Sequence, residues 1–271
     1  MMVPTQSDVL LAAQVHVQYG DKPAVLRDVE VEIRRGEVLG LIGQSGSGKS
    51  TLAMAILGLL DRKRAQVKGA IEFDGSDLLQ LRERELRELR GRKIALVLQS
   101  PLSSLNPALK IQTQLKEAWR AHARRSNDDC QKAIRAALES VSLPSSDEFL
   151  RKHPSQMSVG QAQRVLIAMA VMHRPALLIA DEATSALDVI TQAEILSLFR
   201  ELNRNFGMAI LYISHDLASV AGICDRVTIL HGGQIVETGA TAQVLTNPQH
   251  EYTQKLMAAL PKMPAVKAAA V

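Results

Sequence analysis

The stretch GQSGSGKST at residues 43–51 constrains the fold of this 271-residue chain more than any other feature of its sequence. It follows directly on the apolar run VLGLI at 38–42, and residues 49–60 after it have a helical pattern. A glycine-rich loop between a buried strand and a helix can turn successive backbone N–H groups inward, and the positive end of the helix then favours an anion. The motif therefore predicts a phosphate-binding loop, and a glycine-rich turn beside an ordinary capped helix is the alternative interpretation.

Two side chains give the loop its expected chemistry. Lys49 would place a positive charge at the β- and γ-phosphates of a nucleotide, and Ser50 would give Mg²⁺ an oxygen ligand. The remaining residues would contribute mainly backbone N–H groups. The predicted nucleotide-binding residues of the loop are Gly43, Gln44, Ser45, Gly46, Ser47, Gly48, Lys49, Ser50 and Thr51.

The apolar runs on either side of this loop predict an α/β fold. Residues 10–19 and 25–33 are β-rich and separated by turn residues, which is typical of a small antiparallel sheet. Residues 111 to about 143 have a helical pattern without strand periodicity, broken at 126–128. Further strand-like runs alternate with helical segments, as in a parallel sheet covered by helices, and they fall at 94–99, 176–180 and 208–214.

The composition argues against nucleic acid as a partner. The net charge is only +4 and aromatic residues make up 3% of the chain, so neither a strong basic surface nor a base-stacking surface is indicated. The charged stretch at 77–93 mixes both signs, which is typical of the solvated face of an amphipathic helix rather than of a basic stripe.

No segment of the sequence predicts export or a membrane span. The N-terminus lacks the basic region of a signal peptide, and the apolar run at 52–60 is about half the length that a membrane helix needs. Cys130 and Cys224 stand far apart, which predicts reduced thiols of a cytoplasmic protein. Any role at a membrane would then come through a partner.

Acidic and imidazole side chains follow two later strand-like runs. Asp181 and Glu182 come directly after LLIA at 177–180, and His215 follows the run at 208–214. In a phosphate-loop enzyme the first acid of such a pair holds Mg²⁺ and the second can polarise the attacking water. Exposure of both acids in a loop is the alternative, and His215 by its position alone is as compatible with a structural role as with a functional one.

A further stretch, QMSVGQAQRVLIAMAV at 156–171, completes a set of ordered motifs that resembles the ATP-binding subunits of ABC transporters. The resemblance covers about residues 10–260. It implies a P-loop NTPase (RecA-like) parallel sheet, an N-terminal antiparallel subdomain and an inserted helical subdomain. The implied limits are 8–255 for the nucleotide-binding domain, about 100–170 for its helical part, and 256–271 for a short C-terminal tail.

The resemblance also implies roles for single residues. ATP would bind with its adenine on Tyr19, Mg²⁺ would be held by Ser50, Gln99 and Asp181, and the catalytic residues would be Glu182, His215 and Gln99. Gln99 would also couple the nucleotide to a membrane subunit, and Asp188 falls in the stretch SALD that matches the D-loop.

The signature of the family, Leu-Ser-Gly-Gly-Gln, is changed in this chain. It stands as MSVGQ, with Ser158, Val159, Gly160 and Gln161, and in the family it closes over ATP held by a second cassette. Valine adds bulk and restricts the backbone where the family has glycine. The ATP site that this signature completes would therefore turn over slowly, or in an asymmetric dimer; simple tolerance of valine is the alternative.

Two stretches resemble importers for oligopeptides, dipeptides and nickel: QSPLSSLNP at 99–107 and NPQHEYTQKLMAALP at 247–261. The short tail without a cysteine cluster favours nickel or a metal chelate over peptides. The implied partners are a second, different ATP-binding subunit, two permease subunits and a periplasmic or extracellular substrate-binding protein, with the chain on the cytoplasmic face of the inner membrane. A non-transport ABC protein acting on nucleic acid or ribosomes is the remaining class, and the single phosphate loop argues against it.

Overall fold

Two sheets carry the fold, and the smaller one is formed mainly by the N-terminal part of the chain. The computed structural model describes residues 8–123 and 126–258. Within these ranges the smaller sheet is antiparallel, with the order β2-β1-β4-β5. Its strands are β1 (Val9–Tyr19), β2 (Leu26–Arg34), β4 (Ala65–Phe73) and β5 (Ser76–Asp77).

The larger sheet is parallel except at one edge. Its order is β10-β9-β3-β8-β7-β6, and only the pairing of β10 with β9 is antiparallel. β9 and β10 form a hairpin, and β9 also joins the parallel core through β3. The strands are β3 (Val38–Ile42), β6 (Ile94–Val97), β7 (Leu177–Asp181), β8 (Ala209–Ser214), β9 (Arg226–His231) and β10 (Gln234–Ala240).

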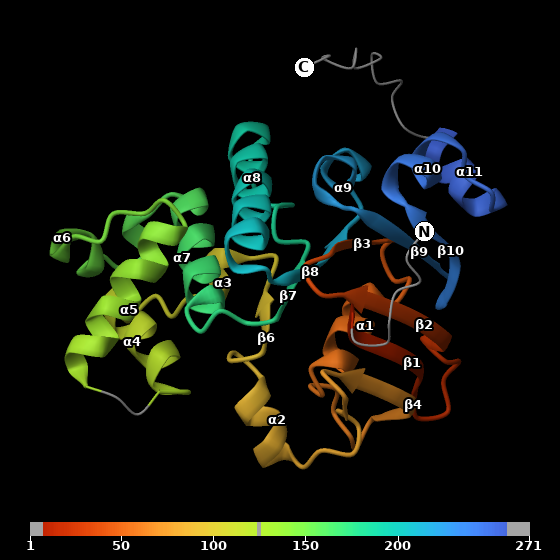
Figure 1. The fold of residues 1–271 in the computed structure, drawn as a ribbon, viewed down its shortest axis with the longest axis horizontal. Coiled ribbons are helices and arrows are strands. Elements are labelled where there is room, and N and C mark those ends of the chain that lie inside the picture. The colour runs from red at the N-terminus through yellow and green to blue at the C-terminus, as the bar shows by residue number, and fades with distance from the viewer. Residues whose placement is uncertain (1–7, 124–125, 259–271) are drawn as a thin grey trace.

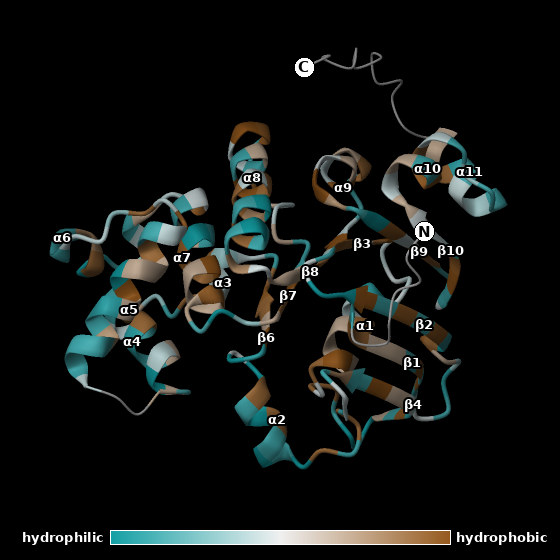
Figure 2. Cartoon of the chain, viewed as in Figure 1, coloured by the Kyte–Doolittle hydropathy of each residue, from teal (hydrophilic) through white to brown (hydrophobic). Residues whose placement is uncertain are grey.

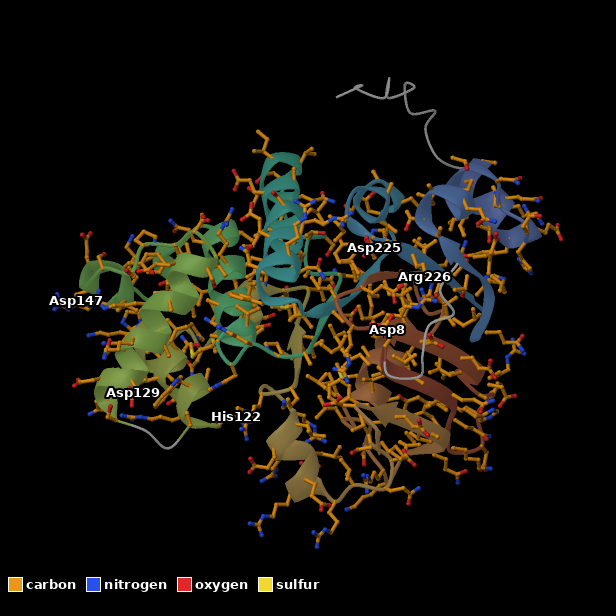
Figure 3. All side chains as sticks on the ribbon, viewed as in Figure 1. Asp8, His122, Asp129, Asp147, Asp225 and Arg226 are labelled. Atoms are coloured by element: carbon orange, nitrogen blue, oxygen red, sulfur yellow. The ribbon has the colours of Figure 1, made fainter. Side chains whose placement is uncertain are left out.

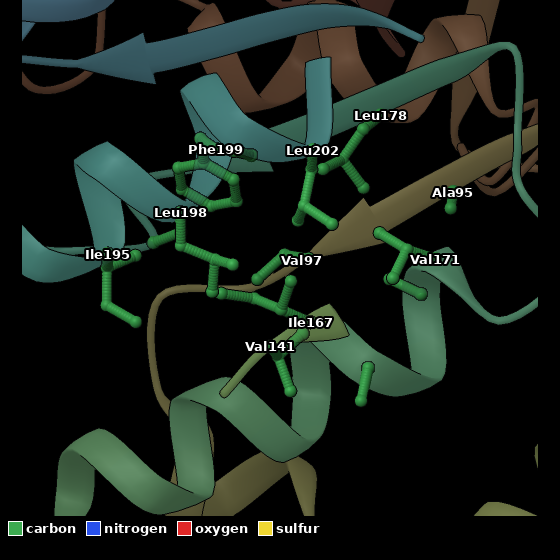
Figure 4. Packing of buried hydrophobic residues seen from close by; sticks show 14 of the residues in the cluster. Ala95, Val97, Val141, Ile167, Val171, Leu178, Ile195, Leu198, Phe199 and Leu202 are labelled. Atoms are coloured by element: carbon green, nitrogen blue, oxygen red, sulfur yellow. The ribbon is translucent and has the colours of Figure 1, made fainter. Parts of the chain in front are cut away.

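The central strands are buried on both faces, as their continuous apolar runs predict. Along β8, Leu211 and Ile213 face the antiparallel sheet and α1 (Lys49–Ile56). Ile210 and Tyr212 point to the other side, where α7 (Val159–Val171) and α8 (Val189–Phe206) cover the sheet. Figure 2 shows the hydrophobic colour concentrated along these strands, and Figure 4 shows α7 and α8 packed against the strands that carry Val97 and Leu178.

A group of helices lies to one side of the sheets, at the left of Figure 1. It is inserted between β6 and β7, and the expected helical stretch at 111–143 forms two of its helices, divided near the expected break at 126–128. The limits 100–170 and 8–255 remain predictions, and most of the expected tail, 259–271, lies outside the described residues. The inserted helices are α3 (Pro101–Ser104), α4 (Ile111–Arg120), α5 (Asn127–Ser140), α6 (Asp147–Leu150), η2 (Pro154–Gln156) and α7.

Several predicted elements are shorter than expected. The helix at 49–60 ends at Ile56, and the strand at 94–99 ends at Val97, which leaves Gln99 beyond the sheet. The charged stretch 77–93 is helical only in α2 (Glu83–Leu89), because the Asp77 carboxylate accepts the N–H groups of Ile71 and Leu79 and folds the start of the stretch into a turn.

Three helices near the C-terminal part of the described chain complete the fold. They are α9 (Leu217–Ile223), α10 (Thr241–Thr246) and α11 (Glu251–Ala258). None of the three was predicted from the sequence. The cap of α9 is Asp216, whose side chain accepts the N–H of Ala218. Among residues 8–123 and 126–258, no helix has the length and apolarity that crossing a bilayer requires.

Polar side chains anchor the starts of two core strands. Glu37 is 8% exposed and accepts a hydrogen bond from Arg226 Nη1 at 2.9 Å. The Asp225 carboxylate accepts the N–H of Val38, also at 2.9 Å, and Figure 3 labels Asp225 and Arg226 side by side. These bonds fix the start of β3, and the other end of β3 leads into the glycine-rich loop.

Candidate functional site

The glycine-rich loop joins β3 to α1, as its sequence predicts. Gly48 precedes the helix with φ 108° and no side chain caps the helix. The first N–H groups of α1 therefore have no side-chain acceptor and are available to an anion. Lys49 is 6% exposed and folds back over the loop, where its Nζ donates to the carbonyl oxygens of Gly43 at 2.7 Å and Gln44 at 3.1 Å.

Two glycines of the loop stand where no side chain fits. A Cβ on Gly43 would clash with the carbonyl oxygen of Leu230 and lie 2.6 Å from Ser47 Oγ. A Cβ on Gly48 would lie 2.5 Å from Leu26 Cδ2, and its left-handed backbone is strained for any other residue. The loop is thus held in shape by β2 and β9, which come from distant parts of the sequence.

A pocket of about 530 Å³ opens above this loop. It brings together three segments that the sequence analysis singled out, namely the loop, Gln99 and the end of β7. Val25 also contributes to its wall and was not predicted, because only tertiary packing brings the segment before β2 to the loop. The lining residues are Val25, Ser45, Gly46, Gly48, Lys49, Ser50, Thr51, Gln99, Asp181 and Glu182.

A larger hollow of about 700 Å³ lies over β1, β2 and the β9–β10 hairpin, but its charge is unsuited to phosphate. Four carboxylates and one arginine line it, namely Asp28, Glu30, Glu32, Glu72 and Arg226. The smaller pocket has the buried Lys49 and the open helix end, so it is the candidate site for a polyphosphate.

Asp181 ends β7 as a buried carboxylate beside the loop. It is 8% exposed, and its Oδ1 is buried without a hydrogen-bond partner among the described residues. Burial raises the pKa of Asp181, while a hydrogen bond with Ser50 lowers it. Burial likewise lowers the pKa of Lys49, against the attraction of Glu182 and Asp181.

The Asp181 carboxylate and the Ser50 hydroxyl fit a magnesium ion. A buried carboxylate oxygen without a partner is costly unless a cation meets it. Mg²⁺ is usually held by one or two protein oxygens together with phosphates, so no dedicated cage of acidic side chains is needed. Asp181 and Ser50 have this chemistry, and Gln99 lies on the same pocket wall.

The backbone of Glu182 has a conformation that is uncommon for a residue other than glycine. Its φ is 48°, in the left-handed region, and its N–H donates to the carbonyl of Ile213 at 2.9 Å. Its Oε1 lies 3.3 Å from His215 Nδ1 on the loop after β8. The parallel sheet thus brings the predicted acid and the predicted histidine into contact beside the pocket, as neighbouring strands that end at one edge would.

The signature and the D-loop meet each other rather than the pocket. Ser158 caps α7, its Oγ accepting the N–H of Gln161 at 3.2 Å, while Gln161 Oε1 accepts the N–H of Ser158. Asp188 caps α8 and accepts the N–H of Thr191 at 3.0 Å, which holds the pKa of Asp188 below its ordinary value. The two helix ends touch where a Cβ on Gly160 would lie 2.7 Å from Thr191 Cγ2.

Other predicted residues lie away from the pocket lining. Tyr19 ends β1, is half-buried, and its carbonyl accepts the N–H of Lys22 at 3.1 Å. Gly43 and Ser47 are buried and Gln44 is exposed, and none of the three lines the pocket. Val159 is 38% exposed at the start of α7.

The match to a family model agrees with this geometry. Residues 26–185 match the model described as ABC transporter. The chain belongs to this family, and its fold and site define the class of ATP-binding cassettes, which hydrolyse ATP.

Curated relatives narrow the comparison. The chain is 42% identical over 246 residues to the oligopeptide transport ATP-binding protein OppD of Escherichia coli (strain K12), covering 91% of this chain and 72% of that protein. It is 38% identical over 269 residues to the glutathione import ATP-binding protein GsiA of Salmonella choleraesuis (strain SC-B67), covering 96% of this chain but only 43% of that protein. The chain therefore spans less than half the length of the glutathione import protein.

Solved structures share the fold. The ATP-binding cassette MJ0796, in a dimeric post-hydrolysis state bound to ADP and phosphate, aligns with a TM-score of 0.73 and 28% identity over 85% of this chain and 98% of its own. The cbiO1 protein from Clostridium perfringens, part of a cbiONQ transporter complex, aligns with a TM-score of 0.77 and 28% identity over 94% and 96%.

Proposed function

We propose that this chain drives the import of peptides, including small ones such as glutathione, as the ATP-hydrolysing subunit of an inner-membrane transporter. The observation that carries the chemistry is the convergence of Lys49, Asp181 and Glu182 on one pocket at the end of α1. The cargo class rests on the relatives, whose names specify oligopeptide transport and glutathione import.

Each side chain of the pocket has a task in this proposal. Lys49 leaves the loop carbonyls and holds the β- and γ-phosphates, and Ser50, Asp181 and Gln99 hold Mg²⁺, which neutralises phosphate charge when bound. Glu182 accepts a proton from the attacking water, and His215, 3.3 Å away, orients that carboxylate and the water. Tyr19 stacks on the adenine.

The proposal includes a second cassette. Ser158, Val159, Gly160 and Gln161 stand at the open start of α7, outside the pocket of their own chain. They would therefore act on ATP held by a partner, and the altered residue at Val159 favours a different ATP-binding subunit as that partner. Two permease subunits and an external substrate-binding protein complete the transporter, with this chain peripheral on the cytoplasmic face of the inner membrane.

The expected preference for nickel finds no support among the relatives compared above. It rested on the shortness of the tail, and tail length says little about cargo because the ATPase subunit does not contact the cargo. The alternative kept open by the stretches at 99–107 and 247–261, a peptide importer, is the one that we propose.

Uptake in a deletion strain tests the proposal. Labelled oligopeptide, labelled glutathione and labelled nickel are each offered to cells that carry wild type, Glu182→Gln or Glu148→Gln on a plasmid. Glu148 lies exposed on α6 and is the matched control. We expect peptide or glutathione uptake to fall on deletion and to be restored by wild type and Glu148→Gln but not by Glu182→Gln.

Two results would contradict the proposal in different ways. Loss of nickel uptake alone would overturn the cargo class and leave the ATPase chemistry untouched. Full restoration of uptake by Glu182→Gln would remove Glu182 from the hydrolytic step.

A further inference from the structure

A set of buried polar groups lies directly behind the contact between Glu182 and His215. Tyr212, on β8, is completely buried, and its Oη lies 2.9 Å from Thr184 Oγ1. The hydroxyl groups of Ser219 and Ser214 also face this phenol. A phenol inside a sheet core needs such partners, because an unpaired buried hydroxyl is costly.

The same groups continue to the loop that carries His215. Asp216 Oδ2 accepts hydrogen bonds from Ser219 Oγ and from Gln192 Nε2, the latter at 2.8 Å, and Gln192 Nε2 also donates to Ser219 Oγ at 2.6 Å. The N–H of Asp216 donates to Ser214 Oγ at 3.0 Å. We call this set, Thr184, Gln192, Tyr212, Ser214, Asp216 and Ser219, the hydroxyl network.

The position of the hydroxyl network matters because its members lie next to both Glu182 and His215 in the chain. Thr184 is two residues after Glu182, and Ser214 and Asp216 are the neighbours of His215 in the chain. The His215 side chain is 59% exposed, so the backbone that carries the ring, more than packing around it, sets where the ring lies. Tyr212 is the member that bridges the two loops, through Thr184 on one side and the serines on the other.

We propose that Tyr212 is a positioning residue, whose hydroxyl holds the Glu182 strand end and the His215 loop at the spacing that ATP hydrolysis requires. The proposal rests on the proposed roles of Glu182 and His215. Burial raises the pKa of Tyr212, so the phenol keeps its proton at neutral pH and can donate it in a hydrogen bond. Glu182 has a left-handed backbone, and such a conformation persists only where its surroundings hold it.

The test is ATP hydrolysis by the full chain, purified with the subunits that assemble with it. Tyr212→Phe removes one oxygen atom and keeps the ring in the core. We expect kcat to fall about five- to tenfold, the equivalent of one hydrogen bond, while the KM for ATP stays within about twofold. Tyr252→Phe is the matched control, because Tyr252 Oη is a buried hydroxyl on α11 without a partner among the described residues.

A second pair of variants changes Thr184, the partner of the Tyr212 hydroxyl in this hydrogen bond. Thr184→Val removes the hydroxyl at nearly constant volume and should reproduce the loss in kcat, whereas Thr184→Ser keeps the hydroxyl and should retain activity. If serine is impaired and valine is not, the threonine methyl group and not its hydrogen bond is what matters, and the proposal is wrong.

A double-mutant cycle separates positioning from a general loss of structure. In a His215→Ala background, Tyr212→Phe should cause no further fall in kcat, because the spacing between Glu182 and the imidazole has no effect once the imidazole is gone. An equal fall in both backgrounds, or a kcat of Tyr212→Phe equal to that of Tyr252→Phe, overturns the inference. Hydrolysis that survives Glu182→Gln would instead contradict the proposed roles on which the inference rests.

Discussion

The phosphate loop at 43–51 and the signature at 158–161 both lie at the start of a helix, but the two helices begin in opposite ways. α1 begins at Gly48 without any side-chain cap, whereas α7 begins at Ser158 with a reciprocal capping box to Gln161. The first arrangement leaves backbone N–H groups free for a phosphate, and the second already satisfies part of its own helix end.

Their surroundings differ as well. Gly43 and Gly48 are pressed against Leu230 and Leu26, so this chain alone fixes the shape of the phosphate loop. Around the signature, apolar side chains are open to solvent, with Val159 at 38% and Val189, at the start of α8, at 81% exposed. Such exposed apolar side chains at two adjoining helix ends favour a surface that another molecule covers. The phosphate loop is therefore fixed within this chain, whereas the signature, in its proposed role, stays open to a partner.

Lys49→Ala should give the largest effect on the phosphate-loop side of the comparison. The charge that we propose holds the phosphates is lost, and we expect ATP affinity to fall by about 100-fold or more, since a charged hydrogen bond in a buried site contributes about 3 kcal/mol. Binding of a fluorescent ATP analogue to the purified chain measures this. Ser158→Ala is the matched change in the signature and should leave the ATP affinity of the single chain within about twofold. A large loss of affinity in Ser158→Ala would mean that the signature also binds ATP within its own chain.

Glycine-to-alanine changes should destabilise the phosphate loop more than the signature. In Gly43→Ala the new Cβ meets the backbone carbonyl of Leu230, which cannot rotate away, so we expect a loss of about 1–3 kcal/mol in the free energy of unfolding. In Gly160→Ala the Cβ meets only a side-chain methyl group of Thr191, so the loss should be smaller. Denaturant unfolding of both variants measures the difference, and equal losses would mean that the signature is packed as tightly as the loop.

The residues that could be predicted from the sequence are those that belong to a local pattern. Lys49, Asp181 and Glu182 were found because each is fixed by a local pattern, a strand followed at once by a loop or an acid pair, and the parallel sheet brings the strand ends together. The core was predictable for the same reason, since β3, β7 and β8 read as continuous apolar runs.

What escaped prediction depends on contacts between distant segments. Val25 reaches the pocket only because β2 packs beside the loop. Tyr212 looked like one more apolar strand residue, since its partner Thr184 lies 28 positions away in the chain. The helix α2 proved shorter than its charge pattern suggested, because the Asp77 carboxylate accepts the N–H groups of Leu79 and of Ile71 on β4 and holds the start of the charged stretch in a turn.

A pH-dependent effect is expected at Asp181, smaller than those of the glycines. Because burial raises the pKa of Asp181 above its ordinary value of 3.8, the folded chain binds a proton there more tightly than the unfolded chain does. The stability that this gives is present at low pH and is lost as pH rises through the raised pKa. Without Mg²⁺ or nucleotide, Asp181→Asn should therefore be more stable relative to wild type at pH 8 than at pH 4.

Mg²⁺ and ATP together should make wild type more stable than Asp181→Asn. Thermal unfolding of both proteins with and without Mg²⁺·ATP measures it, and we expect wild type to gain much more from the ligand than Asp181→Asn does. Equal gains would show that Asp181 does not hold the ion, and a wild type that becomes relatively more stable with rising pH in the absence of ligand would contradict the role of burial.

Val159→Gly should give the smallest effect, and it bears directly on the open half of the site. If the valine hinders approach of a partner's ATP, glycine should raise ATP hydrolysis by the assembled transporter about two- to fivefold, equivalent to roughly 0.4–1 kcal/mol in the barrier. Glycine also weakens the first turn of α7, so a loss of up to about 1 kcal/mol in stability is expected alongside. Val159→Ala keeps a Cβ without the branch and should fall between the two. An unchanged rate in both variants would mean that the site tolerates valine, and the asymmetry between the two halves would then be one of exposure and packing, without a consequence for turnover.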